Sequence, residues 1–192
     1  LTIETPDDID MLREHCVYVF IEIEKEFWLE TGKGTLEQKT YPGLREEVDI
    51  HDELPKAKFT FEKTKDQVDE VLSSISNGES FDMDASRKAI QSCVKSILNN
   101  ANALLWLTQV KQQDKYTAEH SLRVGILAIA FGRFIGLKEH ELELIGLCGM
   151  LHDVGKAQIP DDILNKPGRL TRIEYDIMKG HSILGKEALD AQ

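Results

Sequence analysis

Apolar residues recur at helical spacing through most of the second half of the sequence, and this pattern limits the fold more than any other feature. Between residues 89 and 110 they recur every three or four positions, which is the spacing of one buried helical face. Similar patterns run to Phe134 and from about residue 138 to 154, and Thr171 with Glu174 forms a capping box that begins a fourth helix. The sequence therefore predicts a mainly α fold built around a helical bundle.

The first half of the sequence mixes helical and strand-like patterns. Thr5 and Pro6 are typical of a helix start, and residues 17–23 alternate apolar and polar side chains as a half-exposed strand does. Residues 27–54 show neither period and are predicted to be loop, whereas 68–75 again have helical spacing. These patterns predict three parts: a small mixed α/β N-terminal module at residues 1–60, a connecting helix or linker at 61–81, and the helical bundle at 82–192.

Composition excludes some classes of function. The chain has 192 residues, of which 41% are apolar, enough for a real core. With 23 basic and 34 acidic residues its formal charge is −11, which argues against binding to nucleic acid polymers through their phosphates. No segment approaches the roughly 20 apolar residues of a membrane span, so none is predicted. Since the sequence starts at Leu1 and stops at Gln192 within a helix-like pattern, we expect a fragment of a longer protein.

The cysteines and the aromatic residues are both expected to serve packing. The three cysteines, Cys16, Cys93 and Cys148, are odd in number and far apart, which predicts neither disulfides nor a thiolate zinc site. Small apolar core residues in a reducing cytoplasm fit this usage best. Phe131 and Phe134 are likewise expected in the core rather than in a platform for a nucleobase, and so is Trp106.

A histidine and an aspartate stand side by side at the end of an apolar run. Residues 142–151 are expected to be buried, and burying His152 and Asp153 after them would cost several kcal/mol unless partners satisfy both. A divalent cation is one such partner; a hydrogen-bonded core histidine beside a helix-ending aspartate is the alternative. His120 and His181 lie roughly thirty residues to either side, so the three histidines come from different helices, which can converge in a bundle core.

These residues lie within motifs that resemble a known family. Residues 120–188 resemble the HD superfamily of metal phosphohydrolases, and specifically its bacterial HD-GYP branch. The most specific match is the string I-P-x-x-I-L-x-K-P-G at residues 159–168. The other matching blocks are Tyr116–Val124, Leu151–Lys156 and Met178–His181.

The resemblance implies a catalytic metal site. It makes His120, His152, Asp153 and His181 the metal ligands, with Asp153 bridging two ions, and it directs Lys156 toward a substrate phosphate. Asp153 and Lys156 are thus the expected catalytic residues. Nitrogen and carboxylate donors favour iron or manganese, and two such ions can activate water for attack on phosphorus. Some family members have a carboxylate that can hold a third ion where this chain has Tyr116, so two ions are expected.

The resemblance also implies a substrate class. It indicates a cytoplasmic signalling phosphodiesterase that opens a cyclic dinucleotide, most often cyclic di-GMP, to the linear dinucleotide or onward to GMP. A hydrolase of hybrid cyclic GMP-AMP or another nucleotide is one alternative, and a catalytically silent module that binds a partner or the dinucleotide is another.

The resemblance reaches beyond the bundle at both ends. The N-terminal module is similar to a small domain of unknown function that often precedes HD-GYP domains, for which a regulatory or dimer-forming role is expected. In the family a further pair of histidines, another acid and the G-Y-P motif follow the matched region. This C-terminal part is expected to lie beyond Gln192.

Overall fold

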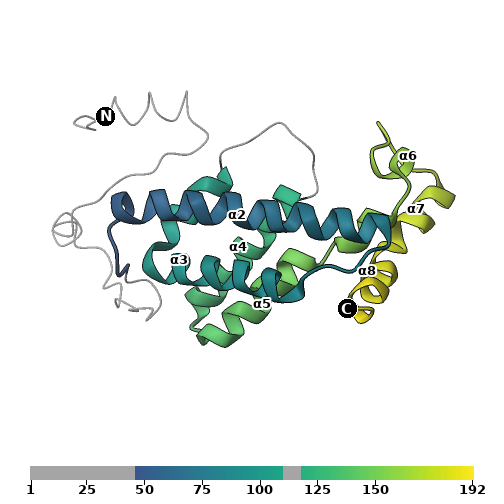
Figure 1. The fold of residues 1–192 in the computed structure, drawn as a ribbon. Helices are drawn as coiled ribbons and strands as arrows, with labels where there is room; N and C mark the ends of the chain where they lie inside the picture. Colours follow the sequence, from purple (N-terminus) through teal and green to yellow (C-terminus); the bar gives the residue numbers. More distant parts are fainter. Residues whose placement is uncertain (1–45, 110–117) are drawn as a thin grey trace, which may run out of the picture. The chain divides into compact units, whose positions relative to one another are not determined.

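Two long helices form the frame of the part of the chain that carries the predicted site. The structure is a computed structural model and describes residues 46–109 and 118–192, all of which belong to one compact unit. Helix α2 (Ile50–Asn77) and helix α3 (Met83–Gln109) lie side by side along most of their length (Figure 1). The mainly α fold predicted from the sequence is confirmed, and no strand occurs in these two described ranges.

Predictions for the first 45 residues cannot be compared with the structure. The helix start at Thr5, the strand at 17–23 and most of the α/β module lie outside the described residues. The predicted module boundary near residue 60 falls in the middle of α2, which continues unbroken through it. That boundary therefore coincides with no end of a described element.

Helix α2 begins earlier than its sequence pattern indicates. The loop predicted up to residue 54 is wrong from Ile50 onward, because Asp49 caps the helix there by accepting a hydrogen bond from the backbone N–H of His51 at 2.8 Å. Glu53 masks the pattern, since it is a charged residue that is only 1% exposed. Its carboxylate accepts hydrogen bonds from Ser96 at 2.7 Å and Asn99 at 3.0 Å, so α3 satisfies the buried charge.

Shorter helices complete the bundle and carry the site. The predicted helices ending near Phe134 and beginning after Thr171 are confirmed, but the third ends at Leu151 and passes into a 3-10 turn instead of reaching residue 154. The remaining elements are α4 (Ala118–Ile135), α5 (Glu139–Leu151), the 3-10 turn η1 (Val154–Gln158), α6 (Asp161–Leu164), α7 (Arg172–Lys179) and α8 (His181–Asp190).

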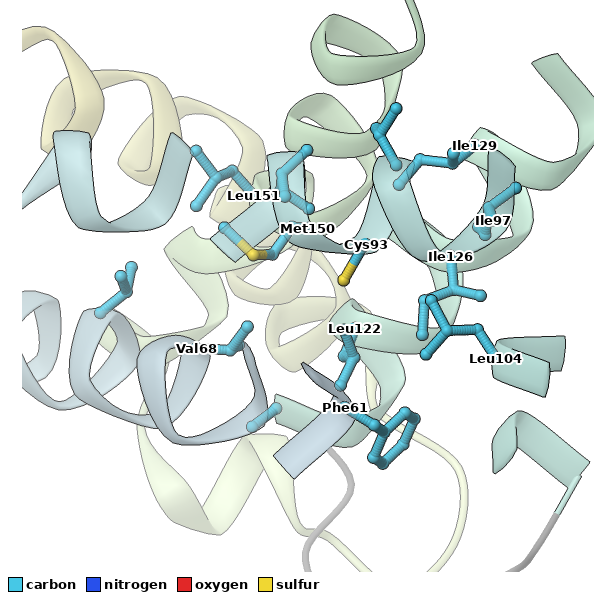
Figure 2. Packing of buried hydrophobic residues seen from close by; sticks show 14 of the residues in the cluster. Phe61, Val68, Cys93, Ile97, Leu104, Leu122, Ile126, Ile129, Met150 and Leu151 are labelled. Carbon is cyan, nitrogen blue, oxygen red and sulfur yellow. The ribbon is translucent and has the colours of Figure 1, made fainter. Parts of the chain in front are cut away.

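The core is formed by side chains from α2, α3, α4 and α5 (Figure 2). Val68, Ile97, Ile126 and Met150, one from each of these helices, are at most 1% exposed. Cys93 is also buried, which raises its pKa to about 11, as expected for a core thiol.

Some residues expected in the core lie on the surface instead. Cys148 is exposed, so the core assignment is wrong for it, and Cys16 lies outside the described residues. Trp106 is 56% exposed, Phe131 62% and Phe134 41%. None of the helices in the described part is long and apolar enough to cross a membrane. The three aromatic side chains Trp106, Phe131 and Phe134 therefore lie outside the core of the described residues.

Helix α3 is interrupted at Asn100, where the backbone is extended (φ −156°, ψ 105°). The side-chain oxygen of Asn100 accepts a hydrogen bond from the N–H of Asn102 at 3.1 Å, which caps the second half of the helix. Its amide nitrogen donates to the carbonyl of Val48 at 2.9 Å, and the N–H of Ala101 donates to Glu46 at 3.0 Å. The segment before α2 thus replaces the helical hydrogen bonds that the interruption removes.

Arg133 of α4 closes this network. Its Nη1 lies 3.0 Å from the carboxylate of Glu46 and donates to the carbonyl of Ile97 at 2.5 Å, while the residue is only 7% exposed. The buried guanidinium thus binds a carboxylate and a carbonyl that the interruption of the helix leaves without its helical donor. It ties α4 to the interruption in α3. Because His120 lies on the same helix, the network also supports the site.

Arg133→Met should lower the free energy of unfolding by about 2 kcal/mol, because a charge-assisted hydrogen bond is lost and a buried carbonyl loses its donor. Urea denaturation followed by circular dichroism measures this. Arg87→Met, at an exposed arginine of α3, is the control and should change stability by less than about 0.5 kcal/mol. Equal stability of the two variants would contradict the role assigned to Arg133.

Candidate metal centre

The structure brings the predicted ligand residues together from separate elements. His120 is in the first turn of α4, His152 directly follows α5, and His181 begins α8. One ligand atom each of His120, His152 and Asp153 lie within 4.8 Å of one another. Residues separated by about thirty positions in the sequence therefore converge, as their placement on different helices predicted.

Asp153 lies at the centre of the group. Its Oδ2 is 3.0 Å from Nε2 of His152 and 3.8 Å from Nε2 of His120. Its other oxygen, Oδ1, is 3.3 Å from Nε2 of His181. The two carboxylate oxygens thus face different histidines, an arrangement that suits a bridging ligand.

Backbone carbonyls orient two of the imidazole rings. Nδ1 of His152 lies 2.7 Å from the carbonyl oxygen of Gly149, and Nδ1 of His181 lies 2.6 Å from that of Met178. A carbonyl only accepts, so Nδ1 is the donor in each ring, and Nε2 is the atom left for a cation. Such an outer hydrogen bond is the usual partner of a metal-binding histidine. Nε2 is the atom that points toward Asp153 in both cases.

Charge around the group favours the protonation states of metal ligands. Burial tends to raise the pKa of Asp153, but the hydrogen bond from Lys156 and the charges of His152 and Lys156 outweigh it and lower that pKa. Burial lowers the pKa of His120, and the neighbouring His152 lowers it further. At neutral pH the carboxylate is ionised and His120 is neutral, as cation binding requires.

The site is less buried than expected from the apolar residues 142–151 that precede it in the sequence. Only one face of α5 packs into the core, and Leu144 is 62% exposed. The side chains of His120 and His152 are each 37% exposed, whereas that of Asp153 is 13% exposed. Full burial was therefore wrong for His152. Because the two imidazoles are accessible, a cation can reach the carboxylate of Asp153. A solute that binds the cation can then reach the same place.

The motif at residues 159–168 contains Lys166 but gave it no role, and the structure shows that this lysine supports the helix before His181. Its Nζ donates to both oxygens of Glu174, at 2.7 Å and 2.5 Å. Glu174 also accepts from the N–H of Thr171 at 2.7 Å, which confirms the predicted capping box of α7. Helix α7 then leads to Met178, whose carbonyl orients His181. The motif marked Lys166 as part of the resemblance, but its pairing with a glutamate eight residues later follows no sequence period.

Glu174→Gln should lower the melting temperature at pH 7 by about 2 °C, because Lys166 loses its charged partner. Hydrogen bonds from Lys166 and then Thr171 lower the pKa of Glu174 to about 2 from its ordinary 4.5. A carboxylate with a depressed folded pKa stabilises fully above the unfolded pKa, and this stabilisation disappears as the pH falls through about 2.

Thermal melts between pH 7 and pH 2 should therefore show the wild-type and Glu174→Gln curves approaching one another below about pH 4.5. Asp176→Asn, which breaks the exposed pair with Lys179 on the same helix, is the control and should change little. A difference between wild type and Glu174→Gln that stays constant over this range would contradict the ion pair.

The donor set fits a divalent cation. Three imidazole nitrogens and a carboxylate, with two rings held by carbonyls, are ligands of the kind that iron, manganese and zinc accept. Lys156 completes the group, with Nζ 2.6 Å from Oδ2 of Asp153. The candidate ligand oxygen thus already has a cationic neighbour.

Comparison with known proteins agrees with this geometry. Residues 117–192 match the HD domain family. A cyclic di-GMP phosphodiesterase of Pseudomonas aeruginosa is 29% identical over 97% of the chain, which spans 47% of that protein. A 3'3'-cGAMP-specific phosphodiesterase of Vibrio cholerae is 38% identical over 49% of the chain and 17% of its own length. A cyclic di-GMP phosphodiesterase of Thermotoga maritima is 42% identical over 38% of the chain and 20% of its own length.

The chain thus spans about half the length of the first of these relatives and less of the others. No solved structure matches it significantly. The match to the HD domain family covers the residues that carry the histidine and aspartate cluster. The relatives named cyclic di-GMP phosphodiesterases agree with the resemblance to the HD-GYP branch that the motifs at residues 151–168 indicated.

Proposed function

We propose that this chain is the metal-binding part of a phosphodiesterase that hydrolyses a cyclic dinucleotide. Cyclic di-GMP is the first candidate, with the linear dinucleotide, GMP or both as products. The observation that carries the proposal is Asp153, whose two oxygens face the Nε2 atoms of three histidines while Lys156 lies beside them. The names of the relatives, cyclic di-GMP phosphodiesterases among them, support the substrate class.

Two divalent ions, iron or manganese, are the proposed cofactors. His120, His152 and Oδ2 of Asp153 would hold one, and His181 with Oδ1 of Asp153 would contribute to the other. Bound there, such ions supply Lewis-acid catalysis to the cleavage of a phosphodiester. The 13% exposure of Asp153 lowers the local dielectric constant and strengthens its hold on a cation.

Lys156 is the proposed contact to the substrate phosphate. Its ammonium lies against the same oxygen of Asp153 that faces His120 and His152, so it neutralises the carboxylate. A divalent cation at that oxygen would compete with the ammonium and favour its turn toward a neighbouring anion. A phosphoryl group that gains negative charge during cleavage is such an anion, and a positioned cation stabilises it.

Asp153→Asn should abolish bound metal and reduce turnover of cyclic di-GMP by at least about 100-fold, because a neutral amide is a poor ligand for a hard cation. Elemental analysis of the full-length protein and chromatography of its products measure both. The helical circular dichroism spectrum should stay unchanged, since the carboxylate lies at the edge of the core. Asp176→Asn is the matched control on an exposed aspartate. Unchanged turnover in Asp153→Asn would refute the metal-site assignment.

Lys156→Met should leave the bound metal in place but reduce kcat about 100-fold, because it removes a positive charge that acts on the transition state. The affinity for Mn²⁺ should stay equal or increase, since a competing cation has been removed. Lys186→Met, which breaks an exposed pair with Asp190, is the control and should keep wild-type turnover. A Lys156→Met enzyme of normal kcat would show that this lysine acts on no phosphate.

A second substrate is favoured by one specific observation: several relatives from Vibrio cholerae are named 3'3'-cGAMP-specific phosphodiesterases. Parallel measurement of kcat/KM for cyclic di-GMP and 3'3'-cGAMP decides between the two. Binding of either dinucleotide without cleavage, in the presence of Mn²⁺ or Fe²⁺, would instead favour a silent regulatory module. The regulatory or dimer-forming role of residues 1–60 and the cytoplasmic location stay predictions.

A further inference from the structure

Two glycines bring the element that contains Asp153 into direct backbone contact with the helix of His181. Gly155 lies in η1, two residues after Asp153, and Gly185 lies one turn after His181 in α8. A Cβ added to Gly155 would overlap the carbonyl oxygen of His181 and the backbone nitrogen of Gly185, and would lie 2.9 Å from Cα of Gly185. No side chain fits at Gly155, so the two backbones are closer than any other residue at this position would allow.

A similar contact joins the helices of the other two histidines. A Cβ on Gly149 would lie 2.9 Å from Cα and 3.1 Å from the nitrogen of Gly125 in α4. Gly149 is also the residue whose carbonyl orients His152, and α4 carries His120. The backbone contact between α4 and α5 is therefore adjacent to the ligands that these helices bring together.

Other glycines of the described ranges lack this property. An added Cβ would meet the backbone of another element closer than 3.0 Å only at Gly149 and Gly155, and each is within three residues of a candidate ligand. Gly132 also packs between α4 and α5, but its added Cβ would meet the flexible ends of Ile145 at 2.5 Å and Leu142 at 2.7 Å. Among the described glycines, those most tightly packed against the backbone of another element thus lie near the candidate ligands.

We propose that Gly155 with Gly185, and Gly149 with Gly125, are positioning residues that set the distances among the metal ligands. The inference rests on the proposed metal centre. A backbone pair in contact fixes α8 relative to Asp153 without any side chain that can change rotamer. Metal sites tolerate only about 0.2 Å in ligand distance, and a misplacement of about 1 Å costs roughly 100-fold in function. Adding one methyl group at these contacts is therefore expected to disturb metal binding before it disturbs the fold.

Gly185→Ala is the informative variant because its strain is small. Its Cβ would lie 3.1 Å from the nitrogen and 3.5 Å from Cα of Gly155, so α8 must shift by only a few tenths of an ångström. Gly155→Ala requires a far larger shift and should lose metal binding altogether. Gly132→Ala is the matched control, since it is also a glycine in a helix, gains the same helix propensity and meets only side-chain ends.

The test is titration of each metal-stripped protein with Mn²⁺ by isothermal calorimetry, with the melting temperature of each apoprotein measured alongside. Gly185→Ala should bind Mn²⁺ about tenfold more weakly than wild type at nearly the same apoprotein melting temperature. Gly132→Ala should keep wild-type affinity even where its melting temperature falls.

The possible failures are distinguishable. A wild-type protein that binds no Mn²⁺ would overturn the proposed function itself. If wild type and Gly185→Ala both bind Mn²⁺ with the same affinity, this inference alone is overturned. Equal losses of affinity in Gly185→Ala and Gly132→Ala would also overturn it, since the loss would then follow general destabilisation. If Gly155→Ala does not fold, the comparison of Gly185→Ala with Gly132→Ala still decides the question.

Discussion

The carboxylate of Asp153 is the group on which the site depends. An ionised carboxylate that is only 13% exposed is costly unless positive or polar partners surround it, and here an ammonium and three imidazoles do so. His152 and Lys156 are close to Asp153 in the chain, whereas His120 and His181 come from α4 and α8, so the full set of partners forms only when these two helices are in place. The same requirement makes the group suited to a cation, because the partners already converge on its two oxygens.

The long helices hold this arrangement from outside. Helix α2 contacts both η1 and α4, and Val154, next to Asp153, is buried in the shared core. The turn that ends α2 is tied to the C-terminal end of the described chain, since the N–H of Phe81 donates to the side chain of Gln192 at 2.9 Å. At the other end of the bundle, Arg133 and Glu46 fix α4 to the interruption in α3. Contacts distant from the site thus hold the helices that carry its ligands.

How much of this was predictable depended on whether a feature is local in the sequence. The capping box at Thr171 and the helical faces after residue 82 follow from short-range patterns, so they were predicted correctly. The pairing of Arg133 with Glu46 joins residues 87 positions apart and has no period. Glu53 hid the start of α2, because a buried charge contradicts the helical pattern unless its partners on α3 are known.

The site residues show the same division. The motif at residues 151–156 located the histidine and aspartate, but the carbonyls that orient the rings are backbone atoms and leave no trace in residue type. Gly155 and Gly185 were visible as letters, yet only the fold shows that their backbones touch. Phe131 and Phe134 had a helical period and were still exposed, because periodicity shows that a helix has an apolar face but not what covers it.

Charge places a last constraint on the chemistry. A chain of formal charge −11 repels a polyanion on average, so the proposed dinucleotide substrate would have to be attracted by a local field. Lys156 lies against Asp153, and Arg123 is close enough to His120 to lower its pKa, although a salt bridge to Glu119 at 2.5 Å offsets its charge. Without bound cations these positive groups are largely neutralised by carboxylates. Divalent ions would reverse the sign of the field at Asp153, so the proposed metals would attract the proposed substrate as well as assist its cleavage.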